Sequence, residues 1–360
     1  MSVQTSDSQL QGVTSTSRIG VQTVSVVIPC FNEERFIGKA LDQLVGQYDA
    51  DNYEIIVVDG LSEDATRKVI EEFQNRHPQL SVRMVDNPGR NIPTALNLGV
   101  VAASGEIIAR MDAHAVPCDG YILRCVTVLN ETHAGAVGMP CMVRPGADTT
   151  MARAIAAAVS HPFGIGDAKY RLGAGGPPQE PVDTVAFACF RKSLWKELGG
   201  FNEGLLTNED YDFNYRIRAS GRDVILDRGG HCDYFARTTL RGLAIQYWRY
   251  GGWKAEMIWL QPKSMKLRHA VAPAFVLSLV FLSIISLFWP IAALVLTTEV
   301  VIYLLSATVA GSRAVAHSER PSVKVVALMP LVFATIHMTW GVSFLLRLIL
   351  PKRVSTVAAA

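Results

Sequence analysis

The sequence has no C-x-x-C pair, although it contains six cysteines. Scattered cysteines of this kind indicate small buried residues in a reducing compartment, and they argue against a structural zinc site. A charge excess is also missing, because 34 Lys and Arg residues face 32 Asp and Glu residues and leave a net charge of +2. We therefore expect no nucleic-acid partner.

Two further features are absent from the beginning of the chain. The first 22 residues have no apolar core and are rich in Ser, Thr and Gln, so residues 1–22 predict a disordered tail and no signal peptide. The first predicted strand, residues 24–29, is not followed by the G-x-G-x-x-G sequence of dinucleotide-binding proteins. We expect the folded part to begin in the cytosol at residue 23.

What the chain does contain is an alternation of apolar runs and helical patterns. The helices are predicted to begin at Asn32 as an N-cap, at Ser62 or Asp64, and at Pro93, which is tolerated in a first turn. This order predicts an α/β fold with a parallel, right-handed sheet. The four predicted strands are residues 24–29, 53–58, 81–85 and 107–111.

The middle of the chain is less regular. We expect a mobile loop over the site at residues 149–181, which are rich in Ala, Gly and Pro. The other predicted elements are strands at residues 135–144, 182–190 and 224–227 and helices at residues 193–198 and 209–219.

Asp112 and His114 stand directly after the fourth predicted strand. In open α/β sheets, ligands bind at the carboxyl ends of the strands. Because they are two residues apart, both side chains can reach one ion, and a carboxylate with an imidazole suits Mg²⁺ or Mn²⁺ bound to a phosphate-bearing ligand. The alternative is a turn carboxylate beside a surface histidine, since an Asp-x-His triplet alone is a weak motif.

Further carboxylates are predicted at the same edge of the sheet. Asp59 ends the second strand, and Glu209 with Asp210 begins a helix. Sugar transfer from a nucleotide sugar needs one group for the nucleotide base, one for a metal on the diphosphate and one general base. These carboxylates meet that need.

Aromatic and basic residues crowd together after the last predicted strand. Residues 239–252 have an amphipathic helical pattern, and Lys254 and Trp259 follow it. This composition predicts a helix on an anionic membrane surface, with a buried core helix as the alternative. Glu299 and His337 interrupt the apolar stretches beyond, and we expect them to make inter-helix hydrogen bonds or to lie at the membrane interface. Three stretches reach bilayer-spanning length: residues 270–289, 291–310 and 323–346.

In order and spacing, these motifs resemble those of the inverting family 2 glycosyltransferases over roughly residues 24–255. The family implies a GT-A nucleotide-sugar-binding fold, Rossmann-like with a mostly parallel sheet, here joined to a C-terminal transmembrane helical region. Within the family, the Asp-Ala-His triplet and the membrane tail are most similar to the succinoglycan glucosyltransferase type. The motifs are Pro29-Cys30-Phe31-Asn32-Glu33, Val57-Val58-Asp59-Gly60, Met111-Asp112-Ala113-His114, Asn208-Glu209-Asp210-Tyr211-Asp212 and Gln246-Tyr247-Trp248-Arg249-Tyr250.

The resemblance assigns roles to residues near the sheet edge. It implies Asp112 as the metal ligand and Asp210 as the general base, with Glu209 as the next candidate. His114 stands where the family's D-x-D motif has its second aspartate, so we treat it as an open candidate for Mg²⁺ or Mn²⁺. His231 is a further candidate metal ligand, with a structural histidine as the alternative. The implied nucleotide-sugar contacts are Pro29, Asn32, Glu33, Asp59, Arg90 and Asp112.

The resemblance also implies an acceptor site. Gln246 and Arg249 match the family's Q-x-x-R-W motif, which contacts the acceptor and the diphosphate. The last residue of the motif is Tyr250 here, and we expect it to stack on a sugar. Trp248 beside it can touch sugar or lipid.

The implied function is membrane-bound, inverting transfer of a sugar from a UDP-sugar, with glucose as the expected sugar. The expected acceptor is a saccharide linked to a lipid through polyprenyl diphosphate, in exopolysaccharide or cell-surface glycan synthesis. Two other enzymes remain as alternatives, a polyprenyl-phosphate sugar synthase and a processive polysaccharide synthase. A membrane transport or scaffold protein that only senses nucleotide is the non-enzyme alternative.

The implied organisation places the protein in the inner, or plasma, membrane with a cytosolic catalytic domain. Three full spans are favoured, although they leave Lys352 and Arg353 outside, against the positive-inside rule. A re-entrant third segment bent at Pro330 is the alternative. The expected parts are a GT-A domain at residues 23–236, membrane-interface helices at 237–268, about three transmembrane helices at 269–350 and a tail at 351–360.

Overall fold

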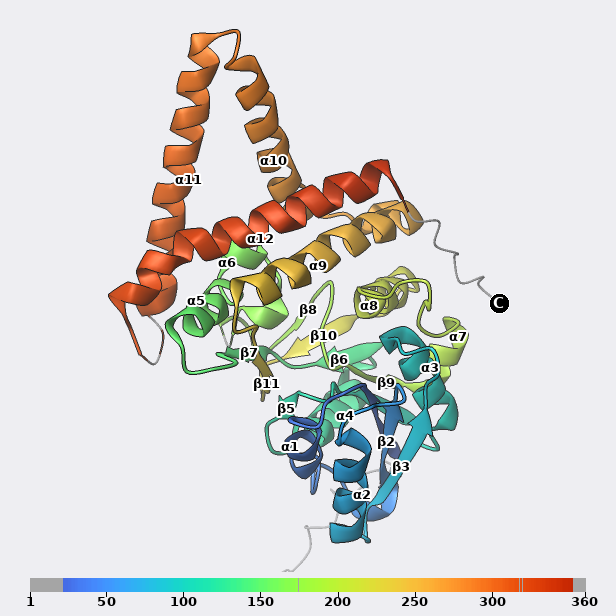
Figure 1. Ribbon diagram of the computed structural model, residues 1–360. Coiled ribbons are helices and arrows are strands. Elements are labelled where there is room, and N and C mark those ends of the chain that lie inside the picture. Colours follow the sequence, from blue (N-terminus) through green and yellow to red (C-terminus); the bar gives the residue numbers. More distant parts are fainter. Residues whose placement is uncertain (1–21, 174, 317, 319, 352–360) are drawn as a thin grey trace, which may run out of the picture.

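The computed structural model describes residues 22–173, 175–316, 318 and 320–351 (Figure 1). The predicted disordered tail therefore lies outside the described residues except for its last position. The same holds for residues 352–360 of the predicted C-terminal tail.

The predicted α/β core is confirmed. Strands β1 (Val24–Cys30), β2 (Tyr53–Asp59), β3 (Ser81–Asp86) and β4 (Ile107–Arg110) pair in parallel in the order β3-β2-β1-β4. Each of the first, second and fourth strands is almost wholly buried, as expected for central strands of a parallel sheet. Their carboxyl ends share one edge, which is where the predicted carboxylates lie.

Four more strands extend this sheet to eight, in the order β3-β2-β1-β4-β9-β6-β10-β8. Within the extension, β9 runs antiparallel to β4 and β6, while β6 and β10 are parallel. The sheet is therefore mostly parallel, as predicted. The added strands are β6 (Ala136–Gly138), β8 (Gln179–Pro181), β9 (Cys189–Arg191) and β10 (Val224–Asp227).

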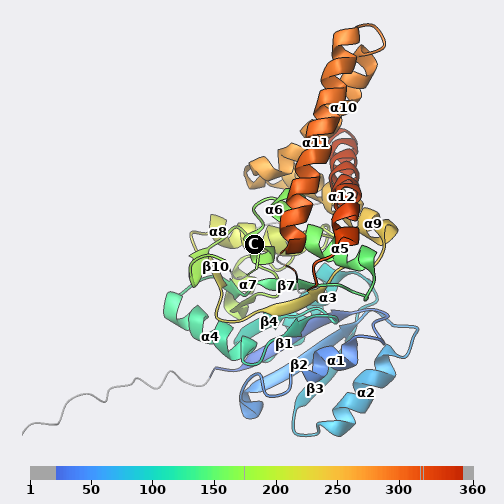
Figure 2. The ribbon, with the colours of Figure 1, turned by 90° about the vertical axis from the view of Figure 1, so that its left-hand side faces the viewer.

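Helices cover both faces of the sheet, and each face has its own buried apolar cluster. Leu41, Phe73 and Tyr121 belong to the cluster under α1, α2 and α4, whereas Leu96 and Phe213 belong to the cluster under α3, α7 and α8 (Figure 2). The helices are α1 (Ile37–Asp42), α2 (Thr66–Arg76), α3 (Ile92–Ala102), α4 (Tyr121–Thr132), α7 (Lys192–Glu197) and α8 (Glu209–Ala219).

Three details of the predicted core are wrong. Helix α2 begins at Thr66 with Ala65 as its N-cap, and not at Ser62 or Asp64. Asn32 does not cap α1: its backbone has a positive φ of 54°, and its side-chain oxygen accepts a hydrogen bond from the Glu63 N–H across the loops. The strand predicted at residues 182–190 is limited to β9, because only its last residues reach the pairing edge between β4 and β6.

The strand predicted at residues 135–144 is two strands in different sheets. The first part is β6 of the main sheet, and the second is β7 (Cys141–Arg144). A small second sheet pairs β7 with β11 (Cys232–Phe235), which in turn pairs with β5 (Val116–Pro117). This sheet brings the segment after Asp112 next to the chain that leads into the membrane-proximal helices.

The loop predicted at residues 149–181 is instead largely built of short helices. They are α5 (Thr150–Ala158), α6 (Pro162–Ile165) and the 3₁₀ helix η2 (Lys169–Arg171), followed by β8. The Ala-rich face of α5 is buried in a third apolar cluster with residues of the C-terminal helices. Alanine serves close packing of helices here, and not loop formation.

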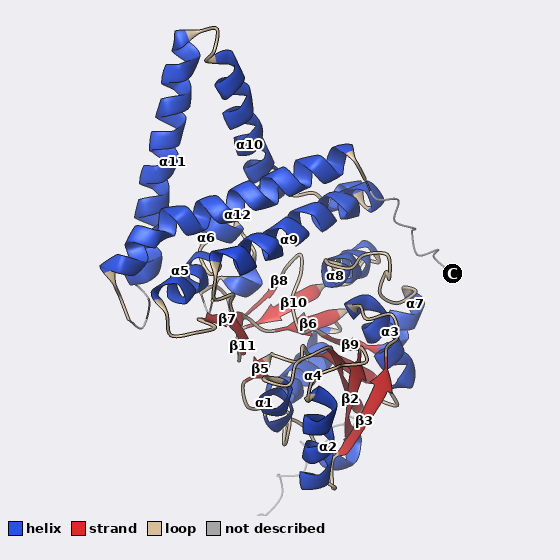
Figure 3. Ribbon diagram, in the orientation of Figure 1, coloured by secondary structure: helices blue, strands red, loops and turns tan. Residues whose placement is uncertain are grey.

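The C-terminal region contains four long helices, which Figure 3 shows in blue. Helix α9 runs beside α12 above the sheet, while α10 and α11 form a hairpin that projects from the body of the molecule (Figures 1 and 2). Three of the four, α10 to α12, are long and apolar enough to cross a membrane, as predicted. The helices are α9 (Leu240–Leu260), α10 (Leu267–Ile285), α11 (Pro290–Ala316) and α12 (Val323–Ile349).

Candidate active site

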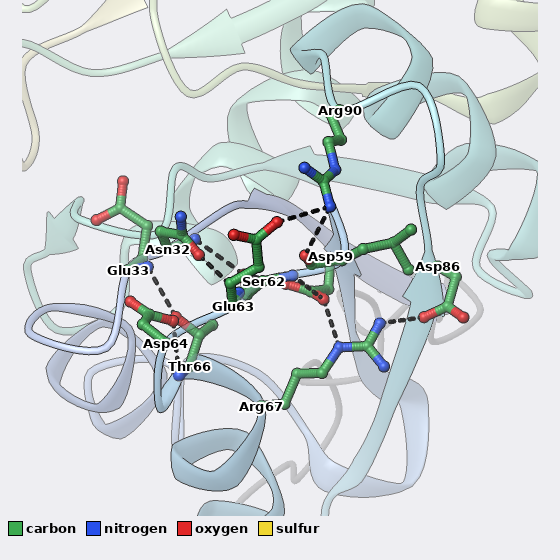
Figure 4. A network of polar contacts seen from close by, with 11 residues as sticks. Asn32, Glu33, Asp59, Ser62, Glu63, Asp64, Thr66, Arg67, Asp86 and Arg90 are labelled. Carbon is green, nitrogen blue, oxygen red and sulfur yellow. Dashed lines mark hydrogen bonds and ion pairs between the residues drawn. The ribbon is translucent and has the colours of Figure 1, made fainter.

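The first part of the site is a network of polar contacts after β1, β2 and β3 (Figure 4). Asp59, at the end of β2, is wholly buried. Its carboxylate accepts hydrogen bonds from the Ser62 N–H (3.0 Å) and hydroxyl (2.5 Å) and from Arg67 Nε (2.6 Å). Asp59 therefore fixes the loop after β2, where the resemblance implies a contact with the nucleotide.

The loops of this network hold strained backbone. Asn32, Leu61 and Arg90 have φ values of 54°, 60° and 48°, which are unfavourable for residues other than glycine. Arg90 forms an ion pair with Glu63 (3.0 Å), and its guanidinium lies 5.4 Å from the centre of the Phe31 ring, which is 42% exposed. An exposed aromatic ring beside an arginine suits the stacking of a flat base.

The second part is a carboxylate centre around Arg110, the last residue of β4. Its Nη2 lies 3.4 Å from Asp112 Oδ1 and 3.0 Å from Glu209 Oε1, and its Nη1 lies 3.9 Å from Asp210 Oδ2. Helix α8 begins at Glu209, as predicted, so both carboxylates stand in its first turn. The structure thus brings Asp112 and the Glu209–Asp210 pair together, as the sequence predicted.

The two neighbouring carboxylates of α8 differ in environment. Glu209 is 4% exposed, and burial raises its pKa to about 7 despite Arg110. Asp210 keeps a side chain that is 35% exposed and accepts a hydrogen bond from the Tyr211 N–H (2.7 Å). A base that takes a proton from a substrate must be reachable, which favours Asp210.

The histidines occupy different places. His114 Nδ1 lies 3.2 Å from Glu33 Oε1; burial lowers the pKa of His114, but Glu33 and Asp112 outweigh it and the net shift is upward. His231 Nε2 lies 3.8 Å from Asp233, and the cavity described next is not lined by His231. Within the described residues, no three His, Cys, Asp or Glu side chains cluster in a metal-binding arrangement.

A cavity of about 940 Å³ begins at these carboxylates and continues between the C-terminal helices. Arg110, Asp112 and Asp210 line it from the sheet domain. Gln246, Arg249 and Tyr250 line it from α9, whereas Trp248 is absent from the lining and is 47% exposed. A further part of the wall comes from α6, α10, α11 and α12, including Phe163, Phe275, Tyr303, His337 and Trp340.

The α9 residues of the predicted acceptor motif are held by polar contacts. Gln246 donates hydrogen bonds to the hydroxyls of Tyr234 (2.9 Å) and Tyr250 (3.0 Å). Arg249 lies at hydrogen-bond distance from the Thr207 hydroxyl (3.4 Å), just before the Glu209–Asp210 pair. These contacts join α9 to β11 and to the segment that leads into the carboxylate centre.

Sequence reasoning missed several cavity residues. Arg171 lies 5.4 Å and 5.3 Å from the ring centres of Tyr170 and Tyr234. Lys254 was expected on a membrane surface but is 4% exposed and lines the cavity. Asn208 Nδ2 is buried with no hydrogen-bond partner among the described residues. The only sequence signal for Lys254 is its distance of eight residues from Gln246, which places both residues on the same face of a helix.

Comparison with known proteins agrees with this geometry. Residues 25–199 match the family model described as glycosyl transferase family 2. The chain is 29% identical over 246 residues to the succinoglycan biosynthesis protein ExoA of Rhizobium meliloti (strain 1021), covering 68% of this chain and 71% of that protein. A dolichyl N-acetyl-alpha-D-glucosaminyl phosphate 3-beta-D-2,3-diacetamido-2,3-dideoxy-beta-D-glucuronosyltransferase of Methanococcus voltae is 26% identical over 243 residues, covering 65% and 74%.

A solved structure resembles nearly the whole chain. The mannosyltransferase PcManGT from Pyrobaculum calidifontis, in complex with GDP-Man and Mn²⁺, superposes with a TM-score of 0.59 at 21% identity, covering 93% of this chain and 89% of that one. This likeness shows a shared GT-A fold. The family match makes residues 25–199 a glycosyl transferase family 2 domain, and with the curated relatives it makes the chain a glycosyltransferase similar to ExoA that acts in polysaccharide or glycan biosynthesis.

Proposed function

We propose that the enzyme transfers a sugar, glucose by its resemblance to succinoglycan synthesis, from a UDP-sugar to a lipid-linked saccharide at the cytosolic face of the membrane. The observation that carries this proposal is the single cavity that extends from Asp112 and Asp210 to the apolar helices α10–α12. A water-soluble donor and an acceptor with a lipid tail both have access to such a cavity.

The donor is proposed to bind across the carboxyl ends of β1, β2 and β4. Pro29, Asn32, Glu33, Asp59 and Arg90 surround the place of the nucleoside, with Asp59 acting through the loop that it holds. Asp112 offers a carboxylate and His114 an imidazole, a donor set that fits Mg²⁺ or Mn²⁺ when a diphosphate and water complete the coordination. Bound there, the ion neutralises charge on the leaving diphosphate. The Mn²⁺ and GDP-Man named for PcManGT support this donor chemistry.

Asp210 is proposed as the base. Its carboxylate takes the proton from an acceptor hydroxyl while that oxygen forms a bond to the anomeric carbon. The bond from this carbon to the diphosphate breaks in the same step, so the configuration inverts and UDP leaves. Arg110 holds Glu209 and Asp112 in place around the reacting groups, and the Tyr211 N–H orients the Asp210 carboxylate.

The acceptor is proposed to approach from α9 and the membrane helices. Gln246 and Arg249 contact its polar part, and Tyr250 stacks on a sugar ring. His114 lines the cavity and His231 does not, so His114 is the better candidate for binding a metal or a phosphate. Trp248, which is exposed on α9, is proposed to contact lipid.

The assignment of the base is tested with Asp210→Asn. We expect UDP-sugar binding within about twofold of the wild type and a transfer rate lower by about 10²–10⁴, the usual effect of losing a general base. The measurement is transfer of radiolabelled sugar to membrane lipid acceptors, with linkage analysis of the product. Asp119→Asn, the same change at an exposed site outside the cavity, is the control. Near-normal transfer by Asp210→Asn contradicts the assignment and makes Glu209 the next candidate.

A further inference from the structure

Lys254 on α9 is a buried cation that has no carboxylate partner in the described part of the chain. The residue is 4% exposed, and its Nζ lies 3.4 Å from the centre of the Tyr211 ring and 3.5 Å from Met257 Sδ. Among the described residues, no acidic side chain lies within ion-pair distance of Lys254. Asp183, whose charge acts on Lys254 from further away, is engaged by Lys266 and Arg268.

Such a placement is unfavourable for the folded protein taken alone. Burying an ammonium group without an opposite charge costs free energy, and burial together with Arg268 lowers the pKa of Lys254 to about 7. The Tyr211 ring and a thioether sulfur compensate only weakly. Because the side chain lines the cavity, a bound anion can supply the missing charge.

The neighbours of Lys254 connect it to the proposed base on one side and to the membrane helices on the other. Tyr211, whose ring it covers, directly follows the proposed base Asp210. On the other side, the Tyr211 ring lies 6.0 Å from His269, and His269 stacks at 6.4 Å on Trp340 of α12. Lys254 therefore stands between the carboxylate centre and the membrane helices.

Beyond His269 the cavity wall is aromatic and apolar. Phe275 of α10 stacks on Tyr303 of α11 (4.7 Å), and Phe163 of α6 lies 5.8 Å from the same Tyr303 ring. Val271, Ile336 and His337 also line this part of the cavity, and His337 Nδ1 lies 2.9 Å from the Tyr303 hydroxyl. Because α10 and α11 form the apolar hairpin, a chain lying here continues directly into a bilayer.

We propose that Lys254 binds the phosphate of the lipid acceptor, with the lipid chain lying along Phe275, Tyr303 and Trp340. This inference rests on the proposed function and adds the group that recognises the acceptor. In the proposed function the donor's diphosphate occupies the catalytic end, and the wall beyond His269 offers mostly apolar and aromatic contacts to a lipid chain. An amphiphile with one anionic headgroup matches both surfaces.

The test measures binding of four probes to the full-length protein in detergent micelles, without donor sugar: farnesyl phosphate, farnesol, inorganic phosphate and UDP. The wild type is expected to bind farnesyl phosphate at least tenfold more tightly than farnesol, and inorganic phosphate weakly. Lys254→Met, which keeps an unbranched side chain and removes the charge, is expected to weaken farnesyl phosphate binding about ten- to a hundredfold and to leave farnesol and UDP binding unchanged.

Two further variants separate charge from apolar contact. Phe275→Ala is expected to weaken the binding of farnesyl phosphate and of farnesol equally, because it removes part of the apolar wall and leaves the charge of Lys254 in place. Lys263→Met, a matched change at an exposed lysine outside the cavity, is expected to bind all probes as the wild type does.

The outcomes are decisive whether or not every variant folds. Wild-type binding of farnesyl phosphate by Lys254→Met overturns the proposal. Equal affinity of the wild type for farnesyl phosphate and farnesol overturns it as well, without any variant. Loss of UDP binding together with farnesyl phosphate binding assigns Lys254 to the donor and also overturns it. Because no transfer is measured, failure of the Asp210 assignment does not affect these readouts.

Discussion

Two buried cations that line the cavity show how differently single residues are stabilised. Arg110 has Asp112, Glu209 and Asp210 within 4 Å, so its charge is balanced by the residues whose positions it fixes. Lys254 has an aromatic ring and a sulfur atom instead. A buried pair that stays intact is tolerated, whereas a lone buried charge costs stability until a ligand arrives. Arg110 is therefore structural within the site, and Lys254 is available for binding.

This cost predicts a pH dependence of stability. The pKa of Lys254 is lowered from 10.5 to about 7 in the folded chain. Between these pH values the unfolded chain holds a proton that the folded chain has lost, so folding becomes more favourable as the pH rises from about 7 to about 10.5. Below pH 7 the full cost is present. At about 1.4 kcal/mol for each pKa unit, it amounts to a few kcal/mol at most.

Lys254→Met is expected to remove this contribution. In thermal unfolding of the ligand-free protein in detergent, the variant should be more stable than the wild type at pH 6–7, and the difference should shrink towards pH 10. Lys263→Met serves as control, and its difference from the wild type should not change with pH. A variant that is less stable than the wild type at pH 6–7 contradicts the prediction, because it shows that the lysine contributes to packing.

At the scale of elements, the sequence predicted those strands and helices whose own residues carry a clear apolar or capping pattern. Strands β1, β2 and β4 are mostly apolar and buried, and α8 and β10 were predicted with their observed bounds, because their patterns match buried strands and an acidic first helical turn. The carboxylates at their ends could therefore be placed at one edge. The cavity could not, since its second wall comes from helices that are distant in sequence.

The missed elements depend on long-range pairing. Strands β5, β7 and β11 have two to four residues each, too few for a periodic pattern, and they exist because β11 lies between the other two. Helix α5 has a clear N-cap, since the Thr149 hydroxyl accepts from the Ala152 N–H. Its apolar face is buried against α12, and the local sequence of α5 does not show that α12 is its partner.

The contact between α9 and α12 yields a prediction at this scale. A Cβ atom at Gly251 lies 2.3 Å from the Trp340 carbonyl oxygen, whereas one at Gly242 lies 3.2 Å from the Thr239 hydroxyl, which caps α9. Both glycines are in α9, where alanine is intrinsically better by about 1 kcal/mol. Gly242→Ala should therefore leave the melting temperature unchanged or raise it. Gly251→Ala should lower stability by about 1–3 kcal/mol, because α12 must move.

Thermal unfolding of the two variants in detergent checks this expectation, and limited proteolysis between α9 and α12 gives a second readout. Transfer activity should fall with Gly251→Ala, since α12 carries part of the cavity wall. Equal melting temperatures for the two variants contradict the packing of α12 on α9.

At the scale of the whole molecule, α12 does not extend beside the α10–α11 hairpin. It crosses the base of the hairpin and follows α9, held by the Ser343 hydroxyl bonded to the Trp248 carbonyl (2.6 Å) and by the pair of Arg347 with Glu256 (3.4 Å) (Figure 1). The predicted polar contacts between membrane helices are present, because Glu299 accepts from Ser278 (2.9 Å) and Tyr303 contacts His337 (2.9 Å).

This arrangement favours two crossing helices and one helix along the membrane surface. Helix α10 has 19 residues and is about 28 Å long at 1.5 Å per residue, close to the ~30 Å of a bilayer core. Residues 286–290 at the tip of the hairpin carry no charge. The basic residues near the other helix ends all lie on the body side of the hairpin: Lys263, Lys266, Arg268, Arg313, Arg320, Lys324 and Arg347.

We therefore predict that α10 and α11 cross the membrane and that α12 keeps both of its ends in the cytosol, in place of the three full spans expected from hydropathy. Single cysteines are introduced at Leu287 in the hairpin tip, at Ser322 before α12 and at Leu350 after it, in a variant without accessible native cysteines. A membrane-impermeant thiol reagent should label Leu287→Cys in intact cells and the other two only after lysis. The positive-inside rule gives the same answer, because this topology leaves every basic end of α10–α12 inside. Labelling of Leu350→Cys in intact cells, with Ser322→Cys protected, shows instead that α12 crosses the membrane and leaves α9 in solution.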